Sequence, residues 1–351
     1  MTDRIRHAFE QQIIWCDRLG SPFTARLCAG FARHLDRELA IGRRLLDWPA
    51  ERNPIVDAVP LRVAGGLHAL VRRGRLPELA RLYPSAPLPD IEALWAAVAR
   101  ALVEAEAELL PWLDRPPQTN EIGRSALLMS GLLAAAAETG LPIALYEVGA
   151  SAGLNLQLDR YRYRLGGLAI GPADAGVLLA PDWTGASPPA ADIHVARRRG
   201  ADLNPIDMAD ARDRERLLAY IWPDQTERLD RTEAALALAV ASPPPLDCAD
   251  AADWTERQFD PTPERGMLRV LMHSIAFQYF PAETRRRLVE HLDRVGRHAT
   301  GQAPLAWLRF EIDPEYEDRP SLRLRLWPHG TDRALALADA HGRNVQWLAA
   351  G

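Results

Sequence analysis

Short apolar runs alternate with helical segments after residue 142, and this rhythm limits what the chain can fold into. Parallel strands covered by helices on both faces produce this alternation. The last two runs flank a Pro328–Thr331 turn and predict an antiparallel hairpin. We therefore expect an α/β fold, with a doubly wound, mostly parallel, seven-stranded sheet that closes with this hairpin. The predicted strands are Ile143–Val148, Ile193–Arg197, Pro245–Ala249, Leu268–His273, Leu305–Ile312, Leu322–Trp327 and Ala334–Asp339.

The residues before this alternation show helical periodicity and no convincing strand. Apolar residues recur every three or four positions, which is typical of amphipathic helices. We expect a helical N-terminal domain or lid at 1–115 and an α/β domain at 116–351, with a β-hairpin insert at about 161–189. The predicted helices are Ile5–Leu19, Phe23–Leu46, Ile55–Arg73, Ile91–Leu113 and a helix from Thr119 that stops at Gly140.

Composition excludes several classes of function. The chain has 42 basic and 47 acidic residues, and its formal net charge of −5 disfavours nucleic acid and anionic membranes as partners. All the basic residues are arginine, so pyridoxal-type Schiff bases and a Walker lysine are excluded.

Cysteine usage and hydropathy indicate the cellular compartment of the protein. Cys16, Cys28 and Cys248 lack CxxC spacing, and no HExxH pattern occurs, so neither disulfides nor a metal site are expected. The longest apolar stretch, Ala126–Ala137, is too short to span a membrane. We expect a cytoplasmic protein with a small-molecule substrate, and its oligomeric state stays open.

The most informative segment is IALYEVGASAGLNL at 143–156, where an apolar strand runs through Glu147 into a glycine-rich loop. A dinucleotide fingerprint would need glycine at Ser151. A GxSxG nucleophile elbow is matched literally with Ser151 as nucleophile, but the elbow should follow several strands. An acidic residue before Gly149, Ser151 and Gly153 matches the first motif of class I methyltransferases with one Gly-to-Ser change. A plain strand-to-helix turn without a ligand is the simplest alternative.

In the methyltransferase interpretation the loop and the helix expected after it hold the cofactor. Bare backbone lets the methionine part of S-adenosylmethionine lie against the loop, and amides at the helix N-terminus face its carboxylate. Serine replaces glycine tolerably if Ser151 has a negative φ. Asn155 opens this predicted helix and joins the candidate cofactor-binding residues.

Polar residues follow the later predicted strands. Ligands of doubly wound sheets sit at the carboxyl ends of the strands. Asp202 follows the second strand and could accept two ribose hydroxyls, and Asp250 with Ala251 follows the third and could meet adenine. His273 and Tyr279 follow the fourth, where His273 suits general-base work. A helix N-cap is the alternative role for each aspartate.

Asn120, Glu121 and Arg124 are expected in the first turns of the helix before the first strand. Arg124 could clamp the carboxylate of the cofactor or substrate, and Glu121 is a candidate catalytic residue. The alternative is a surface ion pair between Glu121 and Arg124. If the N-terminal helices close the pocket, Arg124 faces the ligand.

Several segments resemble those of a bacterial family known only as a domain of unknown function, which is grouped by fold with S-adenosylmethionine-dependent methyltransferases. The resemblance spans nearly the full length and implies a fold and a cofactor, but no substrate or catalytic residue. The segments are PPQTNEIGRSA (116–126), EVGASAGLNL (147–156), RRGADLNP (198–205), YIWPDQ (220–225), DAADW (250–254), HSIAFQY (273–279) and ADAHGRNVQWL (338–348).

The sequence therefore predicts methyl transfer from S-adenosylmethionine to an unidentified small acceptor. The alternatives are a protein that binds this cofactor without methyltransferase activity and a serine hydrolase that uses Ser151.

Overall fold

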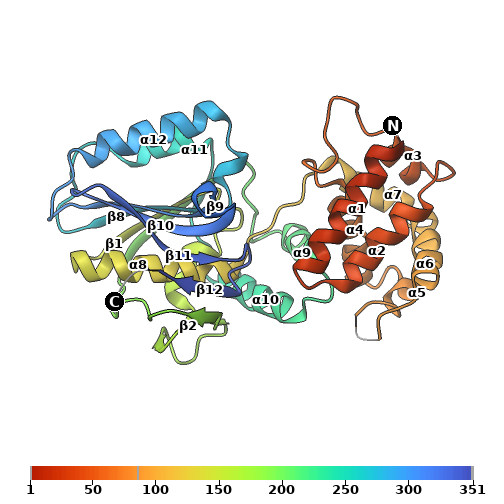
Figure 1. Ribbon diagram of the computed structural model, residues 1–351, viewed down its shortest axis with the longest axis horizontal. Coiled ribbons are helices and arrows are strands. Elements are labelled where there is room, and N and C mark those ends of the chain that lie inside the picture. Colours follow the sequence, from red (N-terminus) through yellow and green to blue (C-terminus); the bar gives the residue numbers. More distant parts are fainter. Residues whose placement is uncertain (1, 85–86, 349–351) are drawn as a thin grey trace. The chain divides into compact units, whose positions relative to one another are not determined.

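The computed structural model describes residues 2–84 and 87–348 and divides into two compact units. The helical unit comprises Met1–Thr119 and Asp210–Glu233, and the α/β unit comprises Asn120–Ala209 and Ala234–Gly351 (Figure 1). The segment Asp210–Glu233 belongs to the helical unit, although in sequence it lies among the alternating strands and helices after residue 142. Neither unit is therefore a single continuous stretch of chain.

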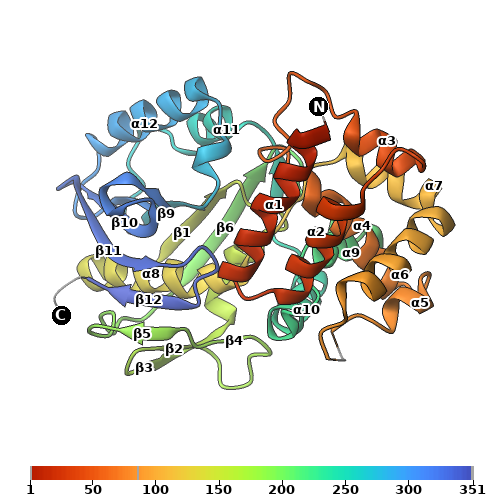
Figure 2. The same ribbon diagram turned by 45° about the vertical axis from the view of Figure 1, so that its right-hand side comes forward.

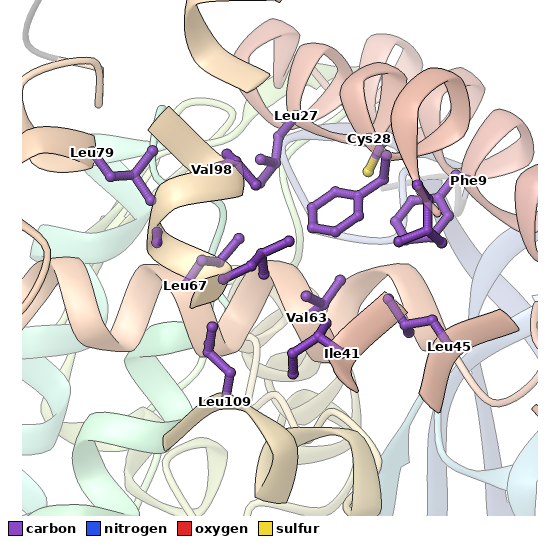
Figure 3. Packing of buried hydrophobic residues seen from close by; sticks show 14 of the residues in the cluster. Phe9, Leu27, Cys28, Ile41, Leu45, Val63, Leu67, Leu79, Val98 and Leu109 are labelled. Atoms are coloured by element: carbon purple, nitrogen blue, oxygen red, sulfur yellow. The ribbon is translucent and has the colours of Figure 1, made fainter. Parts of the chain in front are cut away.

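The helical unit is held together by one apolar core. On α4, Val59, Val63, Leu67 and Leu70 follow a helical spacing and are all buried. Figure 3 shows the side chains of this core converging from several helices. The helices are α1 (Thr2–Arg18), α2 (Pro22–His34), α3 (Ala40–Leu46), α4 (Val59–Arg72), α5 (Pro77–Ala80), α6 (Ile91–Glu104), α7 (Glu106–Leu109), η1 (Leu110–Asp114) and α9 (Ala211–Ala219).

Two of the predicted long helices are interrupted. The chain is extended at Leu35, and the Asp36 carboxylate accepts a hydrogen bond from the Glu38 amide, so α2 and α3 are separate. This side-chain bond competes with a helical backbone bond. The Ile91–Leu113 helix breaks at Ala105 and continues as α7 and η1, where Pro111 has no amide hydrogen to donate.

The segment 210–233 joins the helical unit through a close approach of two helices. A Cβ on Gly65 of α4 would lie 2.6 Å from the Tyr220 ring, which directly follows α9. Burial and nearby Arg72 lower the pKa of His68 on α4 to about 4, while a hydrogen bond of its Nδ1 to the Ala219 carbonyl, 3.2 Å, opposes this shift. His68 is therefore neutral at pH 7.

The α/β unit contains a nine-stranded mixed sheet in the order β5-β12-β11-β10-β9-β8-β1-β6-β7. From β7 to β9 neighbouring strands pair in parallel, and β9 to β12 pair in antiparallel fashion. The predicted C-terminal hairpin is confirmed as β10 and β11. The strands are β1 (Ile143–Val148), β5 (Asp182–Thr184), β6 (Val195–Asp202), β7 (Leu246–Cys248), β8 (Leu268–Ser274), β9 (Leu305–Asp313), β10 (Arg319–Trp327), β11 (Thr331–Ala338) and β12 (Asn344–Trp347).

The prediction of a mostly parallel α/β sheet is confirmed, but the prediction of seven strands is wrong. β12 pairs with β11, and β5 pairs in parallel with β12 at the edge of the sheet. Both strands span only three or four residues, which is too short for an alternating pattern to be recognised.

Helices lie on both faces of this sheet, as Figures 1 and 2 show. α8 (Ser125–Thr139) covers one face, and α11 (Ala251–Gln258) and α12 (Ala282–Gly296) cover the other. α10 (Thr226–Ala241) precedes β7. Every residue of α8 from Ser125 to Ala136 is buried, and this part of the helix is accordingly apolar on nearly all sides. Gly131 lets it approach β9 closely, since a Cβ there would lie 2.3 Å from Leu308.

The insert after β1 forms a second, smaller sheet. β2 (Arg162–Leu165) and β3 (Leu168–Ile170) form an antiparallel hairpin, and β4 (Leu178–Leu179) pairs with β2 in parallel. A 3₁₀ helix, η3 (Asn155–Arg160), links β1 to this sheet.

Candidate functional site

The strand order reverses between β1 and β8. From β1 the chain moves outward to β6 and β7, then returns to β8 and β9 on the other side. In parallel sheets the loops at such a point diverge and leave a crevice at the carboxyl ends of the strands. The carboxyl ends of β1 and β8 carry Glu147 with the glycine loop, and His273 with Ser274.

The glycine loop makes a tight turn with three left-handed residues. The φ angles are +68° at Gly149, +53° at Ser151 and +68° at Gly153. The condition that Ser151 has a negative φ is therefore not met, and a side chain sits where glycine would be unstrained. η3 follows the loop with Gln157 outside the helical region. The expectation of an α-helix after the loop is wrong, because the segment that follows forms this irregular 3₁₀ helix.

Side chains from distant segments hold this loop. The Ser151 amide donates to the Asp202 carboxylate at 2.8 Å, and the Leu154 amide donates to the Asn120 side-chain oxygen at 2.9 Å. The Ala150 amide donates to the Ala201 carbonyl at 3.0 Å. These three amides therefore serve the fold and fix the loop.

The two glycines of the loop face the chain's own side chains. A Cβ on Gly149 would lie 2.6 Å from the Ala276 Cβ, and a Cβ on Gly153 would lie 2.7 Å from the Pro244 ring. Glycine is needed at both positions for left-handed backbone and for close packing. The space that a side chain would need at these two positions is already occupied by Ala276 and Pro244.

Glu147 is a buried carboxyl group at the end of β1. Its exposed fraction is 1%. Burial raises the pKa of Glu147 well above its usual range and nearby Asp202 raises it further, while a hydrogen bond with Asn155 and the charge of Arg124 act in the opposite direction. Its Oε2 atom has no hydrogen-bond partner among residues 2–84 and 87–348. Burial therefore favours the neutral, protonated form of the Glu147 carboxyl group.

A polar shell surrounds Glu147 on the α8 face of the sheet. Ser125, the first residue of α8, donates its hydroxyl to the Asn155 side-chain oxygen at 2.6 Å, which leaves the Asn155 amide nitrogen as the donor toward Glu147. The Tyr161 hydroxyl donates to the Leu154 carbonyl at 2.7 Å. Burial raises the pKa of Tyr161, and Glu147 contributes to this rise. The shell therefore disfavours additional negative charge.

The α-helix begins only at Ser125, so Asn120 and Glu121 precede it, while Arg124 ends a short 3₁₀ turn and is the N-cap of α8. Glu121 is extended and caps the short 3₁₀ helix η2 (Ile122–Arg124), where its Oε1 accepts from the Gly123 amide at 2.9 Å. Arg124 donates to the Ser274 carbonyl at 2.9 Å and to the Ala340 carbonyl at 3.0 Å. These bonds place its charge at the end of β8.

Asp202 ends β6, beside the glycine loop. Val148 of β1 pairs with Ala201, so Asp202 is level with Gly149. One Asp202 oxygen accepts from the Ser151 amide, and the other accepts from the Asn204 amide at 2.8 Å. Because each carboxylate oxygen can accept two hydrogen bonds, two acceptor positions on Asp202 receive no hydrogen bond from residues 2–84 and 87–348.

Asp250 is the N-cap of α11. One of its oxygens accepts from the Ala252 and Asp253 amides at 2.8 and 3.2 Å, and the other accepts from the Thr284 hydroxyl at 3.0 Å. Ala251 is the first residue of the helix. Asp250 therefore has the capping role that the sequence left as its alternative.

His273 points to the opposite face of the sheet from Glu147. Glu147 pairs with Met272 on β8, so the next residue faces the other way. Its Nδ1 lies 2.6 Å from Glu311 Oε1, and the Trp307 indole donates to its Nε2 at 3.0 Å. Both ring nitrogens therefore have protein partners. Tyr279 is 74% exposed.

The structure brings together Arg124, Glu147, Ser151, Asn155 and Asp202 at the end of β1, and it directs His273 to the other face of the sheet. Asp250 follows Ala249, whose amide donates to the Asp202 carbonyl at 3.0 Å, so it lies beside this group as the N-cap of α11. Sequence reasoning missed Glu311, Ser125 and Tyr161. Glu311 had a recognisable signal, since an acidic residue at the carboxyl end of an apolar strand is unusual. Ser125 and Tyr161 carry no such signal.

Two further observations concern metal ions and membranes. Among the described residues, no group of three or more His, Cys, Asp or Glu side chains is arranged to hold a metal ion. Within the same ranges, no helix is long and apolar enough to cross a membrane.

Comparison with known proteins identifies a family. Neither a curated protein nor a solved structure matches the chain. The family described as "Uncharacterized protein conserved in bacteria (DUF2332)" matches residues 6–347, which is nearly the whole chain. The chain therefore belongs to this bacterial family.

Proposed function

We propose that the protein binds S-adenosylmethionine at the carboxyl ends of β1, β6 and β8 and transfers its methyl group to a small acceptor. The observation that carries the proposal is the Asp202 carboxylate, fixed at the end of β6 beside the glycine loop. The order of β7, β6, β1, β8 and β9, which is 3-2-1-4-5 along the chain, supports it because doubly wound, methyltransferase-like sheets bind nucleotides where the order reverses.

The polar residues at the carboxyl ends of these strands fit the cofactor. Gly149 and Gly153 shape the loop and are given no contact with the cofactor. Asp202 would accept the two ribose hydroxyls at its two remaining positions. Arg124 would hold the methionine carboxylate. Glu147 Oε2 would accept from the cofactor's ammonium group, whose positive charge would favour the ionised carboxylate. Bound S-adenosylmethionine supplies an electrophilic methyl group. His273 takes no part, because both its nitrogens have protein partners.

Calorimetry with S-adenosylmethionine and S-adenosylhomocysteine tests this proposal. We expect binding to the wild-type protein and binding at least tenfold weaker to Asp202→Asn. Asp260→Asn is the matched control, because the Asp260 carboxylate also accepts from the amide two residues on, at Thr262. Asp260 lies at the amino end of β8, opposite the proposed site, where its carbonyl accepts from Arg269. No heat and no thermal shift at millimolar ligand would contradict the proposal. Binding without turnover on any acceptor would favour a binding protein.

A serine hydrolase is the second candidate, and the left-handed Ser151 favours it. A nucleophile elbow places its serine on a strained strand-to-helix turn. The Ser151 hydroxyl, however, is buried and has no hydrogen-bonded base within the described residues. Covalent labelling with a fluorophosphonate probe distinguishes the two candidate functions. Labelling of the wild type that disappears in Ser151→Ala would establish the hydrolase, and we expect no labelling of the wild type.

A further inference from the structure

A cavity lies on the α12 face of the sheet, at the carboxyl end of β9. Its volume is about 220 Å³, which is smaller than the pockets typical of drug-sized ligands and suits only a smaller molecule. Trp307 belongs to the apolar cluster under α12, so the residues that alternate with it along β9 face the same side. The lining residues are Phe277, Trp307, Arg309, Glu311, Ile312, Asp313, Glu315, Ser321, Arg323 and Asp332.

Two side-chain atoms in this lining, one from a carboxylate and one from a guanidinium group, have no hydrogen-bond partner in the described part of the chain. Glu311 Oε2 and Arg309 Nη1 are both buried, and neither makes a hydrogen bond to any described residue. Leaving buried charged groups unsatisfied is costly. Arg309 and Glu311 are two residues apart on β9, so the donor and the acceptor lie side by side on one face.

Both side chains are held in place by their other atoms. Glu311 Oε1 accepts from His273 Nδ1 at 2.6 Å and from the amides of Ala276 and Phe277 at 3.0 and 3.2 Å. The Arg309 guanidinium lies 4.3 Å from the centre of the Trp307 ring and pairs with Asp332. The two unsatisfied atoms are therefore preorganised for a ligand.

The charges of the lining indicate the ligand's own charge. The cavity has four carboxylates, at Glu311, Asp313, Glu315 and Asp332, and two guanidinium groups, at Arg309 and Arg323. Arg323 is already paired with Asp313, Glu315 and Asp332. The lining keeps a negative excess, which favours a ligand of net positive charge.

We propose that this cavity binds a basic α-amino acid. Its ammonium group binds Glu311 Oε2, its carboxylate binds Arg309 Nη1, and its cationic side chain meets the remaining carboxylates. This site is separate from the β1 edge, because Glu311 lies on the opposite face of the sheet from Glu147. The inference therefore stands independently of the proposed methyl transfer.

Calorimetry with L-arginine and L-lysine tests this inference on the full-length protein. Agmatine and cadaverine, which lack the carboxylate, and L-alanine, which lacks the cationic side chain, serve as comparison ligands. We expect L-arginine or L-lysine to bind at least tenfold more tightly than the comparison ligands. Equal binding of the decarboxylated amines would overturn the role of Arg309, and no binding at millimolar concentration would overturn the site.

Variants that keep the surrounding contacts make the test specific. Glu311→Gln retains Oε1 as an acceptor but places an amide NH₂ donor, in place of Oε2, toward the cavity. Arg309→Met retains contact with Trp307 but removes the positive charge. Each should weaken amino-acid binding at least tenfold. Arg325→Met is the matched control, since Arg325 also lies over a tryptophan, 4.5 Å from the Trp327 ring centre, and pairs with Asp293 outside the cavity. Unchanged binding in Glu311→Gln and Arg309→Met would refute the proposal. Asp202→Asn should leave amino-acid binding unchanged.

Discussion

The Asp202 carboxylate accepts a hydrogen bond from the Ser151 backbone amide at 2.8 Å and so joins the end of β6 to the loop after β1. These residues are 51 positions apart, and the insert with its small sheet lies between them. The bond holds Ser151 in a left-handed conformation that serine otherwise disfavours.

Replacement of Asp202 by alanine should lower the free energy of unfolding by about 1 to 3 kcal/mol, because the Ser151 and Asn204 amides lose a charged acceptor. Asp202→Asn keeps one side-chain oxygen and should lose less. Urea denaturation measures both. An alanine variant as stable as the wild type would show that these bonds contribute nothing.

Ser151→Gly should leave the protein as stable as the wild type or more stable, since glycine adopts φ of +53° without strain and the variant removes a buried, unsatisfied hydroxyl. Ser151→Val should destabilise it, because a β-branched residue is strained at positive φ. The difference in melting temperature between the two variants is the measurement. A more stable valine variant would contradict the left-handed conformation.

Glu147 should make stability fall as pH rises. Its pKa is raised in the folded protein, so the folded state holds a proton that the unfolded state releases above about pH 4.3. Its contribution is complete below that pH and is lost as pH rises through the folded pKa, at about 1.4 kcal/mol per pH unit. In Glu147→Gln this slope should vanish. Urea denaturation across pH 4 to 9 compares the two proteins, and identical slopes would mean that Glu147 is ionised when folded.

His68 should act in the opposite direction. Its pKa is about 4 in the folded protein and about 6.5 when unfolded. Stability should fall as pH decreases from about 6.5 to about 4, by about 3 kcal/mol in total. His68→Asn can keep a donor near the Ala219 carbonyl and has no charge to gain. Its stability should therefore lose this acid sensitivity. If His68→Asn loses stability at acid pH as much as the wild type does, another titratable group causes the loss.

Arg124→Leu should weaken S-adenosylhomocysteine binding by about 1.5 to 3 kcal/mol, which is the range for a charged hydrogen bond. Arg286→Leu is the control, because Arg286 makes only exposed ion pairs with Glu283 and Glu290 on α12. Calorimetry on both variants measures the difference. Equal binding by the wild type and Arg124→Leu would leave Arg124 with a purely structural role at the Ser274 and Ala340 carbonyls.

Local pattern determined much of this protein. β1 occupies the predicted residues, and α8 ends before Gly140, where a left-handed glycine stops the helix. The same pattern predicted parallel strands followed by an antiparallel hairpin. These features depend on residues close together in sequence, because helix and strand periodicity and turn chemistry act over a few positions.

The tertiary structure decided which of these residues meet. Asp250 became a helix cap and His273 became a buried partner of Trp307 and Glu311, while Asp202 reached the loop of another strand. The segment 210–233 joined the helical unit through the contact between Gly65 and Tyr220. Hydrogen bonds and close packing between residues tens of positions apart select these partners. A local sequence pattern cannot predict them, because it contains no information about which distant side chain will contact a given residue.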